Sequence, residues 1–225
     1  MLPAKHRWKY LAALTVVLPL QSCDWFQPFE HLCEQRLAAT SIDIEAAPIN
    51  VATDFTKSSA ELTAMGAAST GRQVLGLTQT NLKWAVSFSG NGITRRTSGR
   101  HCMRPAIKVR LAFEPMTVLV GSEQRENSCA FNITMDHERK HVAIYERFLA
   151  DISARVETEL RERFGNQIYY FGSEAEAERH VQSITRDYLA PIVDKSMQQV
   201  NARQAVIDTP EEYFRLETFQ NSCGS

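Results

Sequence analysis

A change in the spacing of apolar residues near His137 constrains the fold of this chain more than any other feature. Beyond this residue, apolar side chains recur at intervals of three and four, which is the period of an amphipathic α-helix. They are Tyr145, Phe148, Leu149, Ile152, Val156, Leu160 and Phe164. Gly165 and Asn166 follow, and both are typical of helix ends. The pattern therefore predicts one long helix from about His137 to Phe164.

The first turns of this predicted helix contain His137-Glu138-Arg139-Lys140-His141, which has the form H-E-x-x-H. Histidines four residues apart lie about 40° apart around a helix, so both imidazoles can bind one metal ion. Both lie at the margin of the apolar stripe, and Glu138 lies within it. In this motif the histidines bind zinc and the glutamate is a general base that acts on water. We therefore expect His137 and His141 to be zinc ligands and Glu138 to be catalytic.

A catalytic zinc site needs a third protein ligand and an open position. The extended motif H-E-x-x-H-x-x-G-x-x-H is absent, because Ile144 and Arg147 stand at its last two defined positions. Ser173-Glu174-Ala175-Glu176 predicts the capped start of another helix. This region resembles the downstream helix that supplies a glutamate ligand in some zincins, and we take Glu178 as the first choice. The other candidates are Glu174, His180, Asp187 and Asp194.

The chain beyond Ser173 is expected to remain helical. Pro191 should kink or break the helix that begins there, with a further helical piece from Val193 to about Ala205. Thr209-Pro210-Glu211-Glu212 combines an N-cap threonine, a proline at the first helical position and a glutamate three residues after the cap. These residues predict a last helix that leads to Cys223.

The first half of the chain has the period of β-strands instead. Leu82 to Phe88 and Ile107 to Phe113 alternate apolar and polar residues, which indicates strands with one buried face. Shorter strands are expected within 42–52 and 116–120, and a short helix over about 58–68. We therefore predict an α+β fold, with a mostly antiparallel sheet in the N-terminal half and a helical C-terminal half. Strand 107–113 is a candidate edge strand for pairing with an extended peptide.

The N-terminal residues resemble a secretion signal. Lys5, Arg7 and Lys9 precede the apolar run 11–20, which is too short to span a bilayer comfortably. The sequence Leu-Gln-Ser-Cys at 20–23 resembles a bacterial lipobox, in which the cysteine is lipidated and becomes the mature N-terminus. We expect a lipoprotein-type signal peptide over residues 1–22 and lipidation at Cys23. Cleavage at an ordinary signal-peptide site is the alternative.

Cysteine parity agrees with an oxidising compartment. The chain has five cysteines, so lipidation of Cys23 leaves an even number that can form two disulfides. Of the three possible pairings we favour Cys33–Cys102 and Cys129–Cys223, the second of which would tie the region before the metal-binding helix to the chain end. Free buried thiols are the alternative.

Length and charge limit the remaining classes of function. The chain has 225 residues, enough for one full core, and its net charge is −1. The chain lacks the excess of basic residues that is typical of nucleic-acid-binding proteins, so no nucleic-acid partner is expected.

The order of these elements resembles a family of bacterial secreted proteins described as putative zinc-dependent proteases. The matching residues are Leu82-Lys83-Trp84, Cys102, the strand at Ile107, and His137 to His141, and the resemblance spans about residues 50–165. It implies a zincin-like fold and a zinc cofactor. The family's downstream histidine has no counterpart in residues 194–204, so that ligand is not carried over.

Together these observations predict an envelope lipoprotein that faces the periplasm from a membrane. Its parts would be the signal peptide, a lead-in over 23–40 and a zincin-like metallopeptidase domain over 41–225. It would hydrolyse peptide bonds of a peptide or protein substrate through a zinc-activated water. A zinc amidase acting on cell-wall peptides differs only in substrate. The alternative from another class is a non-catalytic binding or scaffold lipoprotein that retains a metal site.

Overall fold

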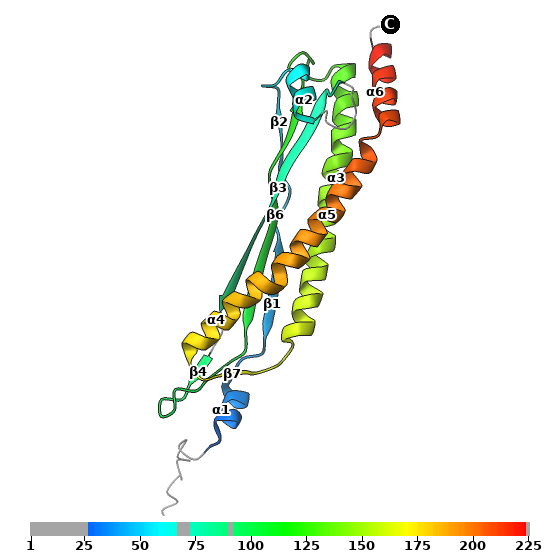
Figure 1. The fold of residues 1–225 in the computed structure, drawn as a ribbon. Helices are drawn as coiled ribbons and strands as arrows, with labels where there is room; N and C mark the ends of the chain where they lie inside the picture. The colour runs from blue at the N-terminus through cyan, green and yellow to red at the C-terminus, as the bar shows by residue number, and fades with distance from the viewer. Residues whose placement is uncertain (1–26, 67–72, 90–91, 224–225) are drawn as a thin grey trace, which may run out of the picture.

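The computed structural model describes residues 27–66, 73–89 and 92–223. The predicted signal peptide and Cys23 lie outside these residues. The molecule is elongated, with a long sheet and two long helical segments that run from one end to the other (Figure 1). Its first half is mixed sheet and its second half is helical, as predicted for the α+β class. No helix in the described part of the chain is both long and apolar enough to cross a membrane.

The main sheet is built around one long strand, β6 (Ala106–Val120). On one side β6 pairs antiparallel with β3 (Gly76–Ser89). On its other side it pairs first with β1 (Ser41–Ala46) and then with β2 (Val51–Asp54), both parallel. The expectation of a mostly antiparallel sheet is therefore corrected, because two of the three pairings in this sheet are parallel. Apolar alternation records which face of a strand is buried, not its direction.

The central position of β6 corrects a second expectation. We expected strand 107–113 to be an edge strand for a peptide, but these residues pair with both β1 and β3. The two strands expected on either side of Glu114-Pro115 are one continuous strand. Pro115 fits there because it lies between the stretches paired with β1 and β2, and opposite a register shift between Thr80 and Leu82 of β3.

A smaller antiparallel sheet lies at one end of the molecule. Its strands are β4 (Gly92–Thr94), β5 (His101–Met103) and β7 (Tyr169–Phe171). Helix α1 (Phe29–Arg36), within the predicted lead-in, is joined to β5 by the disulfide Cys33–Cys102. Helix α2 (Ser59–Gly66) and β2 lie at the opposite end (Figure 1).

Helix α3 (Cys129–Phe164) is longer than the apolar spacing predicted. It begins eight residues before His137, and the Ser128 side chain caps it by accepting a hydrogen bond from the Phe131 N–H. The polar residues close before His137 thus lie within the helix. The predicted end at Phe164 is confirmed, with Gly165 at the C-cap. The H-E-x-x-H motif therefore lies inside a stable helix rather than in its fraying first turn.

The chain then returns along α3 as a nearly continuous helical segment. This segment consists of α4 (Glu174–Ile184), a π-helical turn η2 (Thr185–Leu189) and α5 (Ala190–Ile207). Pro191 does not break it, and the π-helical turn η2 lies directly before the proline. Helix α6 (Pro210–Ser222) follows, capped by the Thr209 side chain as the sequence predicted.

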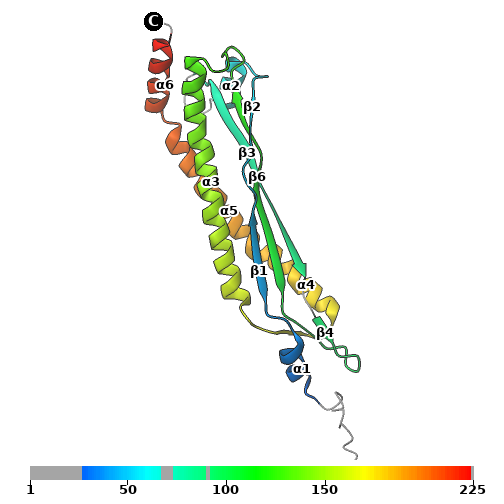
Figure 2. The same cartoon turned by 180° about the vertical axis from the view of Figure 1, so that it is seen from behind.

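The core lies between the sheet and the helices, which cover one face of the sheet (Figure 2). Alternate residues of β6, such as Val109 and Leu111, are buried against apolar residues of α3 and α5, including Val156, Leu160 and Val200. The opposite face carries charged side chains such as Lys108. The alternation read from the sequence therefore identified the buried face correctly.

Candidate metal centre

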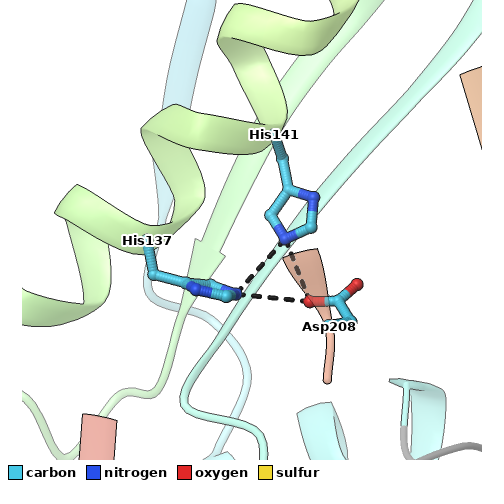
Figure 3. A group of neighbouring side chains, drawn as sticks. All are labelled: His137, His141 and Asp208. Carbon is cyan, nitrogen blue, oxygen red and sulfur yellow. Dashed lines mark hydrogen bonds and ion pairs between the residues drawn. The ribbon is translucent and has the colours of Figure 1, made fainter. Parts of the chain in front are cut away.

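Three side chains converge where the end of α5 meets the first part of α3. His137 and His141 project from successive turns of α3, and Asp208 projects from the short connection between α5 and α6 (Figure 3). The two Nε2 atoms are 3.2 Å apart, and Oδ1 of Asp208 lies 3.3 Å from His137 Nε2 and 3.1 Å from His141 Nε2. Both histidines are buried. The three atoms form a nearly equilateral triangle.

This triangle fits a tetrahedral metal ion. Ligand atoms about 2.0–2.2 Å from a zinc ion in tetrahedral geometry lie about 3.3–3.6 Å from one another. The observed separations of 3.1–3.3 Å are close to that range. A metal ion at the centre would take the place of the protons in the hydrogen bonds among these three atoms. Two imidazoles and one carboxylate leave the fourth position of the tetrahedron open.

The third member of the cluster is Asp208, not the predicted Glu178. Glu178 lies on α4, where it lines a separate cavity of about 580 Å³ with His101 and Glu174, next to the small sheet. His180 is also on α4, packed against the rings of Tyr169 and Phe171. The helix after Ser173 starts near the end of α3 that is remote from the histidines (Figure 1). The choice of Glu178 is therefore corrected.

Several contacts hold Asp208 in place. Its neighbour Thr209 caps α6, which fixes the direction in which that helix leaves α5. The Tyr213 hydroxyl lies 3.3 Å from Asp208 Oδ1, and its ring packs against His137. The disulfide Cys129–Cys223 ties the far end of α6 to the start of α3. Helix α6 is thus held against α3 near both of its ends, and Asp208 lies directly before it.

A neighbouring amide fixes the orientation of the His141 imidazole. His141 Nδ1 lies 2.6 Å from the amide oxygen of Gln204, and the Gln204 amide nitrogen donates to the His141 carbonyl at 3.2 Å. An amide oxygen accepts hydrogen bonds only, so Nδ1 carries a proton, and Nε2 is the nitrogen that faces Asp208 and would present its lone pair to a metal ion. His137 Nδ1 is buried and lies 3.5 Å from Glu212 Oε1. Glu212 is itself held by Lys140.

Glu138 is buried on the same side of α3 as the histidines. One carboxylate oxygen accepts a hydrogen bond of 2.7 Å from the Thr78 hydroxyl of β3. A Cβ at Gly76 would lie 2.7 Å from the other oxygen and 2.6 Å from a Thr134 carbon, so only glycine lets β3 pass this close. Burial raises the pKa of Glu138, although His141, Thr78 and His137 act in the opposite direction. A raised pKa suits a group that accepts and returns a proton near neutral pH.

The charges at the centre are strongly coupled. Burial opposes ionisation of Asp208, but its hydrogen bonds with His137 and His141 hold its pKa well below the usual range. Burial also opposes the charge on His141, yet Asp208 and Glu138 raise its pKa overall. Burial and the charge of Asp208 raise the pKa of Tyr213, which keeps its hydroxyl protonated. The site therefore contains an ionised carboxylate, two imidazoles and a hydroxyl donor.

Two cavities adjoin the centre. The larger one, of about 280 Å³, is lined by His137, Glu138 and residues of α6, including Tyr213. The smaller one, of about 100 Å³, is lined by Glu138, His141, Asp208 and Tyr213. Glu138 and Tyr213 line both, so a molecule in either cavity lies beside the proposed base and the hydroxyl donor.

The structure forms both disulfides favoured from the sequence, Cys33–Cys102 and Cys129–Cys223. Together they indicate an extracytoplasmic location. The predicted lipidation site, Cys23, is not among the described residues.

Comparisons with known proteins find no relative: no family model, no curated protein and no solved structure matches this chain. The resemblance to the secreted putative proteases therefore rests on the quoted residues and stays a prediction. The geometry supports a buried His-His-Asp site on a long helix, of the kind that H-E-x-x-H forms with a metal ion.

Proposed function

We propose that this protein is a zinc-dependent hydrolase of the cell envelope that cleaves peptide bonds. The observation that carries the proposal is the convergence of His137, His141 and Asp208 beside a buried Glu138. Two imidazoles and a carboxylate are a donor set that zinc accepts, and three protein ligands with an open fourth position are typical of catalytic rather than structural zinc sites.

Each side chain has a distinct part in this proposal. His137, His141 and Asp208 hold the ion, which polarises the substrate carbonyl and makes water a stronger acid. Glu138 takes a proton from the attacking water and returns it to the leaving nitrogen. The buried, hydrogen-bonded position of Glu138 keeps its carboxylate aimed at the two cavities. Gln204 keeps His141 in the tautomer that presents Nε2.

The location forms the second part of the proposal. The two disulfides favour an oxidising compartment. We propose lipidation at Cys23, which would attach the chain to a membrane with the domain in the periplasm. Its substrate would then be a peptide or protein of the envelope.

The decisive test compares the wild-type protein with Glu138→Gln. We expect both purified proteins to bind one zinc ion, measured by elemental analysis after reconstitution. Only the wild type should release new amino termini from a mixture of unstructured peptides, because the amide of glutamine cannot accept the proton. A loss of at least about 100-fold in rate is expected from removal of a general base.

Other outcomes would separate the alternatives. Equal amounts of zinc in both proteins, with no peptide turnover by either, would favour a scaffold that retains a metal site. Failure of the wild type to bind zinc, cobalt or nickel after reconstitution would show that His137, His141 and Asp208 do not form a metal site.

A further inference from the structure

Different residues of the metal centre line two cavities of different size. His137 lines the cavity of about 280 Å³, which we call the large cavity. His141 and Asp208 line the cavity of about 100 Å³, which we call the small cavity. Gly76 and Glu138 line both, so the two cavities adjoin at the proposed general base. Because the Cα atoms of consecutive residues are only about 3.8 Å apart, a substrate carbonyl group beside Glu138 would have one flanking residue toward each cavity.

The two volumes admit different side chains. A cavity of about 150 Å³ is large enough to hold a benzene molecule. The large cavity exceeds this volume, and Leu75 and Leu216 give it apolar surface. The small cavity falls short of this volume, and part of it must also hold the substrate backbone. An aromatic side chain therefore fits the large cavity, whereas the small cavity has room for the side chain of Gly, Ala or Ser.

Tyr145 limits the small cavity on the side of α3. It lies four residues after His141, so both side chains are on the same face of the helix. Its ring packs against the buried ring of Phe113 in β6, with 4.8 Å between the two centroids. Leu77 of β3 and Gln204 of α5 line the cavity as well. Because the ring of Tyr145 rests on the core, its displacement by a larger substrate side chain would disturb close packing and cost free energy.

From these observations we propose that the enzyme cuts peptides next to a small residue. The small cavity accepts Gly, Ala or Ser on one side of the scissile bond, and Tyr145 is the specificity-determining residue that excludes larger side chains. The large cavity accepts a bulky side chain on the other side of the bond. The inference rests on the proposed function and names its substrate class.

The test measures binding of three phosphinic pseudodipeptides to the zinc-loaded protein by calorimetry. The phosphinate group binds zinc and presents one side chain on each side of the position of the scissile bond. The first compound has a Phe side chain before this position and an Ala side chain after it, the second has the reverse order, and the third has Phe at both positions. We expect one of the two mixed compounds to bind at least about tenfold more tightly than the third, because a single methylene group in a pocket already changes discrimination by about 10–200-fold.

Tyr145→Ala should abolish this difference, because it enlarges the small cavity enough to admit a second Phe side chain. Tyr145→Leu, which keeps an apolar contact with Phe113, provides a second enlarged variant if the alanine variant does not fold. Tyr145→Phe is the matched control, since it removes the hydroxyl and keeps the ring, and it should preserve the difference. Leu216→Ala enlarges the large cavity instead and should preserve it too.

The possible outcomes separate this inference from the proposed function. If the wild type bound the compound with two Phe side chains as tightly as the better mixed compound, the assignment of the small cavity would be wrong while the zinc site stayed intact. A difference that survived in the folded Tyr145→Ala or Tyr145→Leu variant would overturn the role of Tyr145, and a zinc-loaded protein that bound none of the compounds would overturn both cavity assignments. A protein that neither retained zinc nor bound any compound would overturn the proposed function and this inference with it.

Discussion

At the scale of single residues, Asp208 decides whether the two histidines form a metal site. His137 and His141 alone present two nitrogen atoms on one helix face, and an imidazole pair is an incomplete ligand set for zinc. The Asp208 carboxylate supplies the third ligand atom and the negative charge. Asp208 lies one residue after the end of α5, so the spacing of residues along a helix does not predict it as a ligand.

Asp208→Ala should therefore weaken zinc binding by at least about 100-fold, since it removes a direct ligand rather than an outer partner, whose loss costs about 10–100-fold. Competition with a chromophoric chelator measures the change. Glu178→Ala is the matched control, because this glutamate was the sequence-based choice and lies on α4 beside another cavity. A larger loss of affinity for the Glu178 variant than for the Asp208 variant would contradict the assignment.

Gln204 is expected to act through His141 rather than on the metal directly. Gln204→Leu removes both hydrogen bonds that orient the imidazole, so zinc affinity should fall by about 10–100-fold. Gln204→Glu, which keeps an acceptor for the Nδ1 proton, should retain more affinity than the leucine variant. Gln198→Leu on the exposed side of α5 serves as the control. If all three variants bound zinc like the wild type, Gln204 would have no positioning role.

At the scale of elements, α6 holds Asp208 and Tyr213 in position at the metal centre. It starts next to Asp208, contributes Tyr213 to the site and ends at the disulfide with the start of α3. None of its residues is buried, so hydrophobic burial contributes little to its attachment. The covalent link and a few polar contacts must therefore keep it in place.

Replacement of Cys129 and Cys223 by serine should lower both stability and zinc affinity. Loss of a disulfide costs about 2–4 kcal/mol in many proteins. The matched control is the double serine variant of Cys33 and Cys102, which removes the disulfide at the other end of the molecule. Urea unfolding should show a loss for both pairs, whereas chelator competition should show weaker zinc binding only without Cys129–Cys223. Equal effects of the two disulfides on zinc affinity would argue against a role of α6 in positioning Asp208.

At the scale of the whole molecule, the metal centre, where α5 leads into α6, lies in the half of the elongated body opposite to α1 (Figure 1). Helix α3 has 36 residues and extends about 54 Å at 1.5 Å per residue. His137 and His141 lie eight and twelve residues after its first residue, and α1 lies near its opposite end.

Zinc should stabilise the entire fold, because its ligands come from segments distant in the sequence and come together only in the native state. A ligand present at 100 times its dissociation constant adds about 2.7 kcal/mol to the free energy of unfolding. The midpoint of thermal unfolding should therefore rise with zinc and return after addition of a chelator. Asp208→Ala should show little of this rise. An equal rise in that variant would indicate that zinc stabilises the protein from another site.

The sequence by itself determined the parts that depend on local spacing. A spacing of four residues places His137 and His141 on one face of a helix and Glu138 near the core, and the four cysteines other than Cys23 predicted two pairs in an oxidising compartment. The cap at Thr209 was read from four consecutive residues. Such features hold in any tertiary context, because neighbours in sequence remain neighbours in space.

Only the tertiary structure decided the strand directions, the third ligand and the cavity. The chain leaves α3 at Phe164, about 35 Å along the helix from His141, and must return by a similar distance. At 1.5 Å per residue, a helix that starts at Glu174 comes back to the level of His141 only after at least about 23 residues, which excludes Glu178. Asp208 and His141 are 67 residues apart. Their contact depends on how α3, α5 and α6 pack, and packing is a property of the whole chain rather than of any segment.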